Sequence, residues 1–157
     1  EALALLLGYF SSQRSAARKI FEEIRLTEPE SREKTSHLAY LLHNLYCSLE
    51  DLFQEVAKTF ENRVEDPSRY HRELLKRMCM EIPGIRPRLL SEAGFRVLDE
   101  LRGFRHIFRH AYDYELSPAK TADLKNRTVG GWDAVQADLM IFANFLERGI
   151  RDNNLLP

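Results

Sequence analysis

Eight consecutive residues combine the side chains that phosphate chemistry needs. The segment from Arg105 to Tyr112 reads Arg-His-Ile-Phe-Arg-His-Ala-Tyr. A guanidinium stays positively charged and offers a planar fork of donors to phosphate oxygens. An imidazole titrates near neutral pH and therefore suits proton transfer. The segment thus brings phosphate-binding groups and acid and base groups together on a short stretch of chain.

A helix is the element expected to position these groups. At about 100° per residue, one side of that helix carries the basic residues Arg102, Arg105, His106, Arg109 and His110. The opposite side collects the apolar residues Val97, Leu101, Phe104, Ile107, Phe108 and Ala111. This spacing predicts a helix from an N-cap at Ser91 to about Glu115, with a core face and a reactive face.

The rest of the chain has the apolar spacing of helices as well. It predicts helices over residues 2–26, for about thirty residues after an N-cap at Ser31 with Pro67 closing the helix, over 70–80, from Pro118 after an N-cap at Ser117 to about 126, and over 132–150. Two prolines and a glycine force a loop at 82–87, and Gly130-Gly131 is expected to break or kink the last helical stretch. No alternating strand pattern competes. The sequence therefore predicts an all-α, up-and-down bundle of four to six helices.

Length and composition limit the class of protein. A chain of 157 residues with 44% hydrophobic and 30% charged residues is expected to form one helical domain over 1–157. The apolar run from Ala2 to Leu7 is much shorter than the roughly 20 residues that cross a bilayer, so no membrane partner is expected. Two cysteines are too few for a disulfide framework. We therefore expect a cytoplasmic protein.

Charge is uneven along the chain. Residues 69–110 hold 10 basic and 5 acidic groups, whereas the whole protein has a net charge of -1. A local excess of this kind favours an anionic partner such as RNA or phosphate. A solvated helix face followed by a basic loop is the alternative, and charge alone does not decide between them.

Other catalytic designs lack their residues. A di-iron bundle needs Glu-x-x-His pairs, and the residue three positions before each histidine is never a glutamate. His106 and His110 could share a metal, but no third ligand is evident. The chain has no Gly-x-Ser-x-Gly and no Gly-x4-Gly-Lys motif. We expect neither a metal nor another cofactor.

The motif is similar to that of a known family. Arg105 and His110 have Arg-x4-His spacing, and Tyr112 follows two residues later, which resembles the Arg-x4-His-x-Tyr signature of HepT-like toxins among HEPN-domain ribonucleases. Roughly 0.5 bare Arg-x4-His pairs are expected by chance, and Arg32 with His37 forms a second pair. That pair lacks the tyrosine. The order of predicted helices and the loop at 82–87 resembles HepT-like proteins over most of the chain.

The resemblance implies an activity and a set of partners. HEPN ribonucleases cut RNA without metal by attack of the 2'-hydroxyl, which leaves a 2',3'-cyclic phosphate. The resemblance assigns His110 as acid or base and Arg105 as the phosphate clamp, with His106, Arg109 and Arg102 supporting or binding RNA. It implies a homodimer, because both motifs of a HEPN pair line one cleft. It also implies AMP transfer to Tyr112 by an MntA-type nucleotidyltransferase antitoxin, which silences the toxin.

Two functions therefore remain open from the sequence. One is an RNA endonuclease toxin that cuts tRNA or mRNA. The other is a catalytically silent HEPN module that binds nucleotide or a protein partner through the same face.

Overall fold

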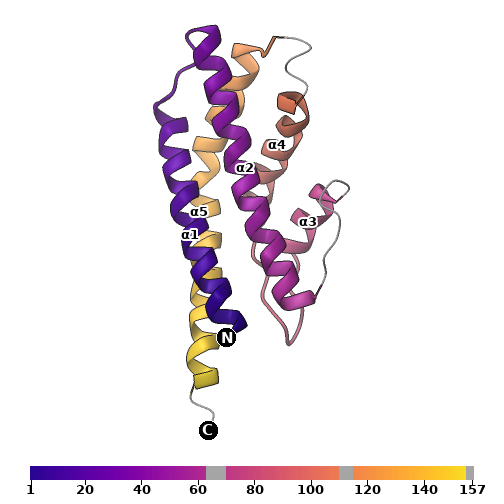
Figure 1. Cartoon of the computed structure of the whole chain (residues 1–157). Coiled ribbons are helices and arrows are strands. Elements are labelled where there is room, and N and C mark those ends of the chain that lie inside the picture. Colours follow the sequence, from indigo (N-terminus) through magenta and orange to yellow (C-terminus); the bar gives the residue numbers. More distant parts are fainter. Residues whose placement is uncertain (63–69, 110–114, 155–157) are drawn as a thin grey trace.

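The fold is a bundle of helices, as the apolar spacing predicts. A computed structural model of the chain describes residues 1–62, 70–109 and 115–154. The described residues form five helices and no named strand: α1 (Ala2–Leu26), α2 (Arg32–Glu61), α3 (His71–Met78), α4 (Glu92–Arg109) and α5 (Pro118–Asn154). In Figure 1, α1 and α2 form an antiparallel hairpin, α5 runs beside α1 and α4, and the short α3 packs against α2 and α4. The all-α prediction is confirmed.

Among the described helices, α2 contributes the largest share of the core. Its large, fully buried apolar residues recur mostly at three- and four-residue spacing: Leu38, Leu42, Leu45, Leu49, Leu52, Phe53 and Val56. Burial of one such side chain contributes about 1.5–3 kcal/mol, so this stripe fixes which face of α2 points inwards. Aromatic pairs join α1 to α5, with Phe10 stacked on Phe142 and Phe21 on Trp132.

Serine side chains start three of the helices. Ser31 accepts a hydrogen bond from the Lys34 amide, and Ser117 accepts one from the Lys120 amide, with Pro118 as the first residue of α5. Ser91 caps α4 by accepting from the Gly94 amide. Each cap satisfies an amide that the helix itself leaves without a partner. The predicted N-caps at Ser31, Ser91 and Ser117 are therefore confirmed.

Helix α2 has the length of about thirty residues that was predicted, from Arg32 to Glu61. It ends where Asn62 takes a left-handed conformation with φ 49°, and Pro67, which was expected to close it, lies outside the described residues. The helix that begins after Ser91 was predicted to reach about Glu115, but Glu115 is not helical, and residues 110–114 lie outside the described residues. An asparagine adopts left-handed dihedrals at little cost, so it can end a helix without a proline.

The expected break at Gly130-Gly131 is also wrong, because α5 continues unbroken from Pro118 to Asn154. A Cβ atom on Gly131 would lie 2.3 Å from Cγ2 of Val97, whereas one on Gly130 would meet nothing within 4 Å. Gly131 therefore allows α4 and α5 to approach closely. The helix tolerates both glycines because this contact and the packing around it hold the segment in place.

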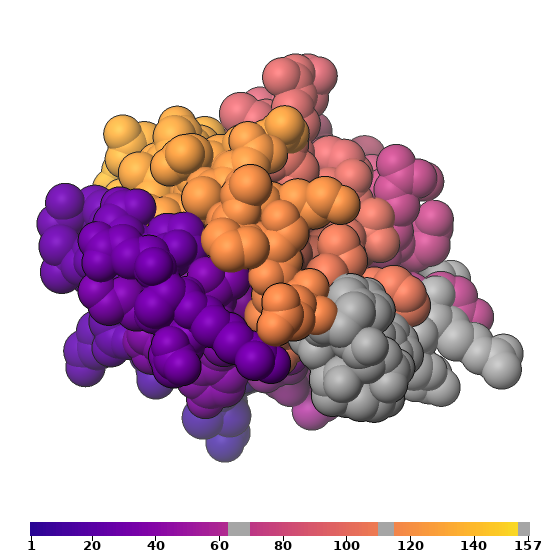
Figure 2. Space-filling model, turned by 90° about the horizontal axis from the view of Figure 1, so that it is seen from above, coloured from indigo at the N-terminus to yellow at the C-terminus, as the bar shows by residue number. Residues whose placement is uncertain are grey.

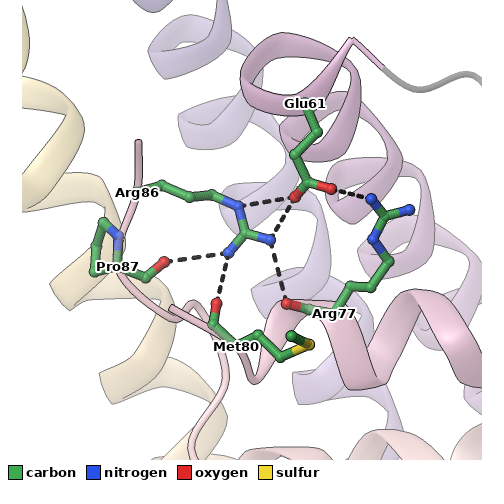
Figure 3. Close-up of polar contacts among 5 residues, drawn as sticks. All are labelled: Glu61, Arg77, Met80, Arg86 and Pro87. Atoms are coloured by element: carbon green, nitrogen blue, oxygen red, sulfur yellow. Dashed lines mark hydrogen bonds and ion pairs between the residues drawn. The ribbon is translucent and has the colours of Figure 1, made fainter. Parts of the chain in front are cut away.

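A buried arginine fixes the loop between α3 and α4. The Arg86 side chain is 0% exposed, and its guanidinium donates to Glu61 Oε1 and to the carbonyls of Arg77, Met80 and Pro87 (Figure 3). The other oxygen of Glu61 accepts from Arg77. All five guanidinium N–H groups are satisfied, as burial of a charge requires. This cluster ties the end of α2 to α3, and so sets where α3 meets α4.

The end of the bundle at which α4 ends and α5 begins is viewed in Figure 2. The junction of α1 and α2 and the first turns of α5 lie next to each other there. Lys125 of α5 is buried and donates to the Thr27 carbonyl at 2.9 Å and to Glu28 Oε1 at 2.6 Å. The first part of α5 is therefore anchored to the junction between α1 and α2.

Candidate functional site

Four of the six predicted site residues lie in the last two turns of α4. Arg102 and Arg105 are half-buried, whereas His106 and Arg109 are exposed. The two remaining candidates, His110 and Tyr112, lie outside the described residues. The structure therefore places the arginines and His106 on one short helical surface, and it leaves the contacts of the proposed acid or base untested.

The buried face of α4 is rotated from the predicted one towards Arg105. Leu98, which falls only about 20° from Arg105 around the helix, is fully buried. Ile107, assigned to the core face from the sequence, is 40% exposed. The reason is that α4 contacts α2 and α3 as well as α5, so its covered arc extends beyond the apolar stripe. Arg105 consequently lies at the edge of a helix interface.

Arg105 is held against α2. Its charge acts on the Cys47 thiol of α2, whose pKa it lowers, and its Nε atom is buried with no hydrogen-bond partner among the described residues. Neither Arg105 nor Arg109 has an ion pair within the described part of the chain. A half-buried guanidinium that no carboxylate neutralises is a suitable group for binding an anion.

Two neighbours of Arg105 on α2 respond to its charge. The His43 ring stacks on Phe108 of α4, with ring centres 4.7 Å apart, and its Nε2 lies 3.6 Å from Cys47 Sγ. Burial lowers the pKa of His43, and the charges of Arg105 and Arg109 lower it further. Burial raises the pKa of the Cys47 thiol, although Arg105 opposes that shift. His43 and Cys47 are therefore neutral neighbours of Arg105 at pH 7.

A second polar group lies one turn further along α2. Tyr46 and Glu50 are buried, and the Tyr46 hydroxyl donates a hydrogen bond to Glu50 Oε2. The same oxygen lies 2.6 Å from Nδ1 of His71, at the start of α3. Burial raises the pKa of Tyr46, as does the hydrogen bond to Glu50, while Arg102 and Arg105 oppose the shift. These three residues were not among the sequence candidates.

An acidic residue joins α3 to α4 nearby. Asp99 accepts a hydrogen bond from Arg102 Nε at 2.9 Å, and its Oδ1 lies 3.7 Å from Arg72 Nε. Arg102 was predicted to support the site or bind RNA. Arg102 therefore has a structural contact with Asp99, whereas Arg105 and Arg109 have no carboxylate partner in the described part of the chain.

Much of the basic excess in residues 69–110 is neutralised within the protein. The described basic residues in ion pairs there are Arg72, Lys76, Arg77, Arg86, Arg96 and Arg102. The exposed pairs among them contribute little stability, but all of these pairs reduce the local positive potential. Arg88, Arg105 and Arg109 have no ion pair among the described residues. The available positive charge on α4 therefore concentrates at its C-terminal end.

Two further observations limit the kind of site. Among residues 1–62, 70–109 and 115–154, no three His, Cys, Asp or Glu side chains come together as a ligand set for a metal ion. Over the same residues, we find no helix whose length and apolar character would allow it to cross a membrane.

Comparison with known proteins gives one family. A family model described as HepT-like protein matches residues 37–146, which is more than two thirds of the chain. The match runs from the first turns of α2 to the last part of α5 and includes the segment from Arg105 to Tyr112. No curated protein and no solved structure matches the chain significantly.

Proposed function

The chain belongs to the HepT-like family, and on this premise we propose that it is a metal-independent RNA endonuclease, the toxin of a HEPN/MNT-type toxin-antitoxin pair. The observation that carries the proposal is the end of α4, where Arg105 and Arg109 lie one turn apart with no carboxylate partner among the described residues. That surface supports binding of a phosphodiester. His110 follows directly in the chain.

The proposed reaction uses groups of the RNA and of the motif. The 2'-hydroxyl attacks the adjacent phosphorus, the bond to the 5'-oxygen breaks, and a 2',3'-cyclic phosphate and a 5'-hydroxyl remain. His110 takes part in the proton transfers, because an imidazole exchanges protons near neutral pH. Arg105 stabilises the negative charge that develops on the phosphorane oxygens. Arg109 and His106 bind the RNA backbone beside it.

The active unit is proposed to be a homodimer. On a straight helix, Arg105 and His110 point about 140° apart, so one chain does not readily bring both to the same phosphate. Two copies whose α4 ends face each other would allow Arg105 of one subunit to meet His110 of the other. A twofold axis makes this contact reciprocal, and so gives two equivalent sites.

A second candidate function uses the same surface without turnover. The unneutralised charges of Arg105 and Arg109 would also hold the phosphate of a nucleotide, or an acidic partner protein, if His110 did not reach a reacting group. The protein would then be a silent HEPN-type binding module. Only the endonuclease function has an RNA substrate, which would be tRNA or mRNA.

An assay for cleavage of total RNA and tRNA by AMP-free protein in EDTA distinguishes the endonuclease from the silent binding module. We expect metal-independent cutting with cyclic phosphate ends, reduced about 10²–10⁴-fold in His110→Ala and about 10²–10³-fold in Arg105→Ala. Arg96→Ala is the matched arginine control, because Arg96 is exposed on the same helix and pairs only with Glu92 among the described residues. His37→Ala controls for loss of a surface histidine on α2. Absence of cutting by the parent protein would favour the binding module.

A further inference from the structure

A buried carboxylate organises the junction of α2 and α3. Glu50 is 5% exposed, and its Oε2 atom has two partners, the Tyr46 hydroxyl and Nδ1 of His71 at 2.6 Å. A carboxylate removed from water is costly unless its oxygens are hydrogen-bonded, so both contacts are needed. Tyr46 is itself 0% exposed and cannot turn away to solvent. The position of the Glu50 oxygen is therefore well defined.

This contact defines the state of the His71 ring. A carboxylate can only accept, so Nδ1 of His71 must carry the proton that it shares with Glu50. The other ring nitrogen, Nε2, is then the one that can accept or release a proton. The His71 side chain is 15% exposed, so the ring is mostly enclosed but still reaches the surface. An oriented imidazole at the surface is the arrangement that acid and base catalysis needs.

His71 also lies next to the motif helix. Arg72, the next residue, pairs with Asp99 of α4, which in turn accepts from Arg102. The charges of Arg102 and Arg105 both act on Tyr46, the other partner of Glu50. In Figure 1, the first turn of α3 lies beside the middle of α4. Among the described residues of the neighbouring helices, the charged groups that face this end of α3 are Glu50 of α2 together with Asp99 and Arg102 of α4.

The proposed reaction requires two proton transfers at different atoms. One proton leaves the 2'-hydroxyl as the bond from O2' to phosphorus forms. Another reaches the 5'-oxygen as its bond to phosphorus breaks. The two oxygens lie on opposite sides of the phosphorus in an in-line displacement, so one imidazole cannot serve both at the same moment.

We propose that His71 is a second proton-transfer residue of the same site, oriented by Glu50 and Tyr46, and that it works on the oxygen opposite the one served by His110. This inference rests on the proposed RNase function. Nε2 of one histidine takes the proton from the 2'-hydroxyl, while Nε2 of the other delivers a proton to the 5'-oxygen. Glu50 and Tyr46 are positioning residues and do not touch the RNA.

The decisive variant is His71→Asn. The asparagine amide nitrogen can replace Nδ1 as the donor to Glu50, while Nε2, the atom proposed to exchange the proton with RNA, is lost. We expect kcat on an oligoribonucleotide to fall about 10²-fold or more with KM little changed, and one limb of the bell-shaped pH profile to disappear. His37→Asn, a surface histidine of α2, should leave both unchanged. Glu50→Gln should lower kcat less than His71→Asn, because the ring remains but is less well oriented.

A second substrate identifies which oxygen His71 serves. Uridine 3'-(4-nitrophenyl phosphate) has a leaving group that needs no protonation. If His71→Asn cuts this compound at the parental rate, His71 is the acid at the 5'-oxygen, and if the defect persists, His71 is the base at the 2'-hydroxyl. Either result supports the proposal. Parental kcat and pH profile on RNA, in a variant with the parental melting temperature, would overturn it. Failure of the parent protein to cut any RNA would instead remove the proposed function itself.

Discussion

Tyr112 is the residue at which the proposed toxin would be regulated. It lies three residues beyond Arg109, and an attached AMP would bring a phosphate close to the arginines at the end of α4. We expect co-expression with an MntA-type nucleotidyltransferase to add AMP to Tyr112 and to abolish RNA cleavage. Peptide mass spectrometry of the co-expressed protein locates the modification.

The neighbouring tyrosine provides the control. Tyr114 lies two residues further on and has the same phenol. Tyr114→Phe should still be modified and silenced, whereas Tyr112→Phe should remain unmodified and toxic in the presence of the antitoxin. AMP found on Tyr114 or elsewhere in the wild-type chain would remove the assignment to Tyr112.

Local spacing predicts only part of the candidate site. It places Arg102, Arg105, His106 and Arg109 on one helix, because they lie within eight residues of each other. It misses Glu50 and His71, which are 21 residues apart in the chain and meet only through the packing of α3 on α2. One signal was present in the sequence. Glu50 lies between Tyr46 and Phe53 on the buried stripe of α2, and a carboxylate on such a stripe requires a partner.

At the scale of the helices, two adjacent glycines of α5 should respond in opposite ways to the same substitution. Gly130→Ala adds a methyl group in open space and should stabilise the protein by about 0.5–1 kcal/mol through helix propensity. Gly131→Ala brings a Cβ to 2.3 Å from Val97 Cγ2 and should destabilise it by about 1–3 kcal/mol. Urea denaturation of both variants measures the two changes.

Shortening Val97 tests whether its Cγ2 atom causes the destabilisation expected for Gly131→Ala. In a Val97→Ala background, Gly131→Ala should cost less than it does alone, because Cγ2 of Val97 is then absent. Equal costs in both backgrounds would show that the approach of α4 to α5 does not depend on this contact.

These glycines also show why helix ends and helix breaks are unequally predictable. A serine cap acts on an amide three residues away, so Ser31, Ser91 and Ser117 were found from the sequence alone. A glycine pair looks the same in a sequence whether it bends its helix or allows another helix to pack closely against it. Only the position of Val97 on another helix decides between them, and that position belongs to the tertiary structure.

For the whole molecule, we expect two chains to make each catalytic site. If Arg105 of one subunit meets His110 of the other, a mixture of Arg105→Ala and His110→Ala protein should regain activity. A mixed dimer then has one site with both residues intact and one site with neither. Equal amounts that exchange freely should recover about a quarter of the parental rate, since half of the dimers are mixed and each has one working site.

The amount of recovery distinguishes a site shared between two chains from a site built within one chain. A site built within one chain would stay inactive on mixing, because every chain lacks one of the two residues, whether or not the protein is a dimer. A stable monomer by light scattering that still cuts RNA would exclude the shared site directly. Covalently linked parental and doubly substituted chains give the complementary test, because a shared site requires Arg105 and His110 from different halves and should leave such a linked dimer almost inactive, whereas a site within one chain would keep about half of the activity.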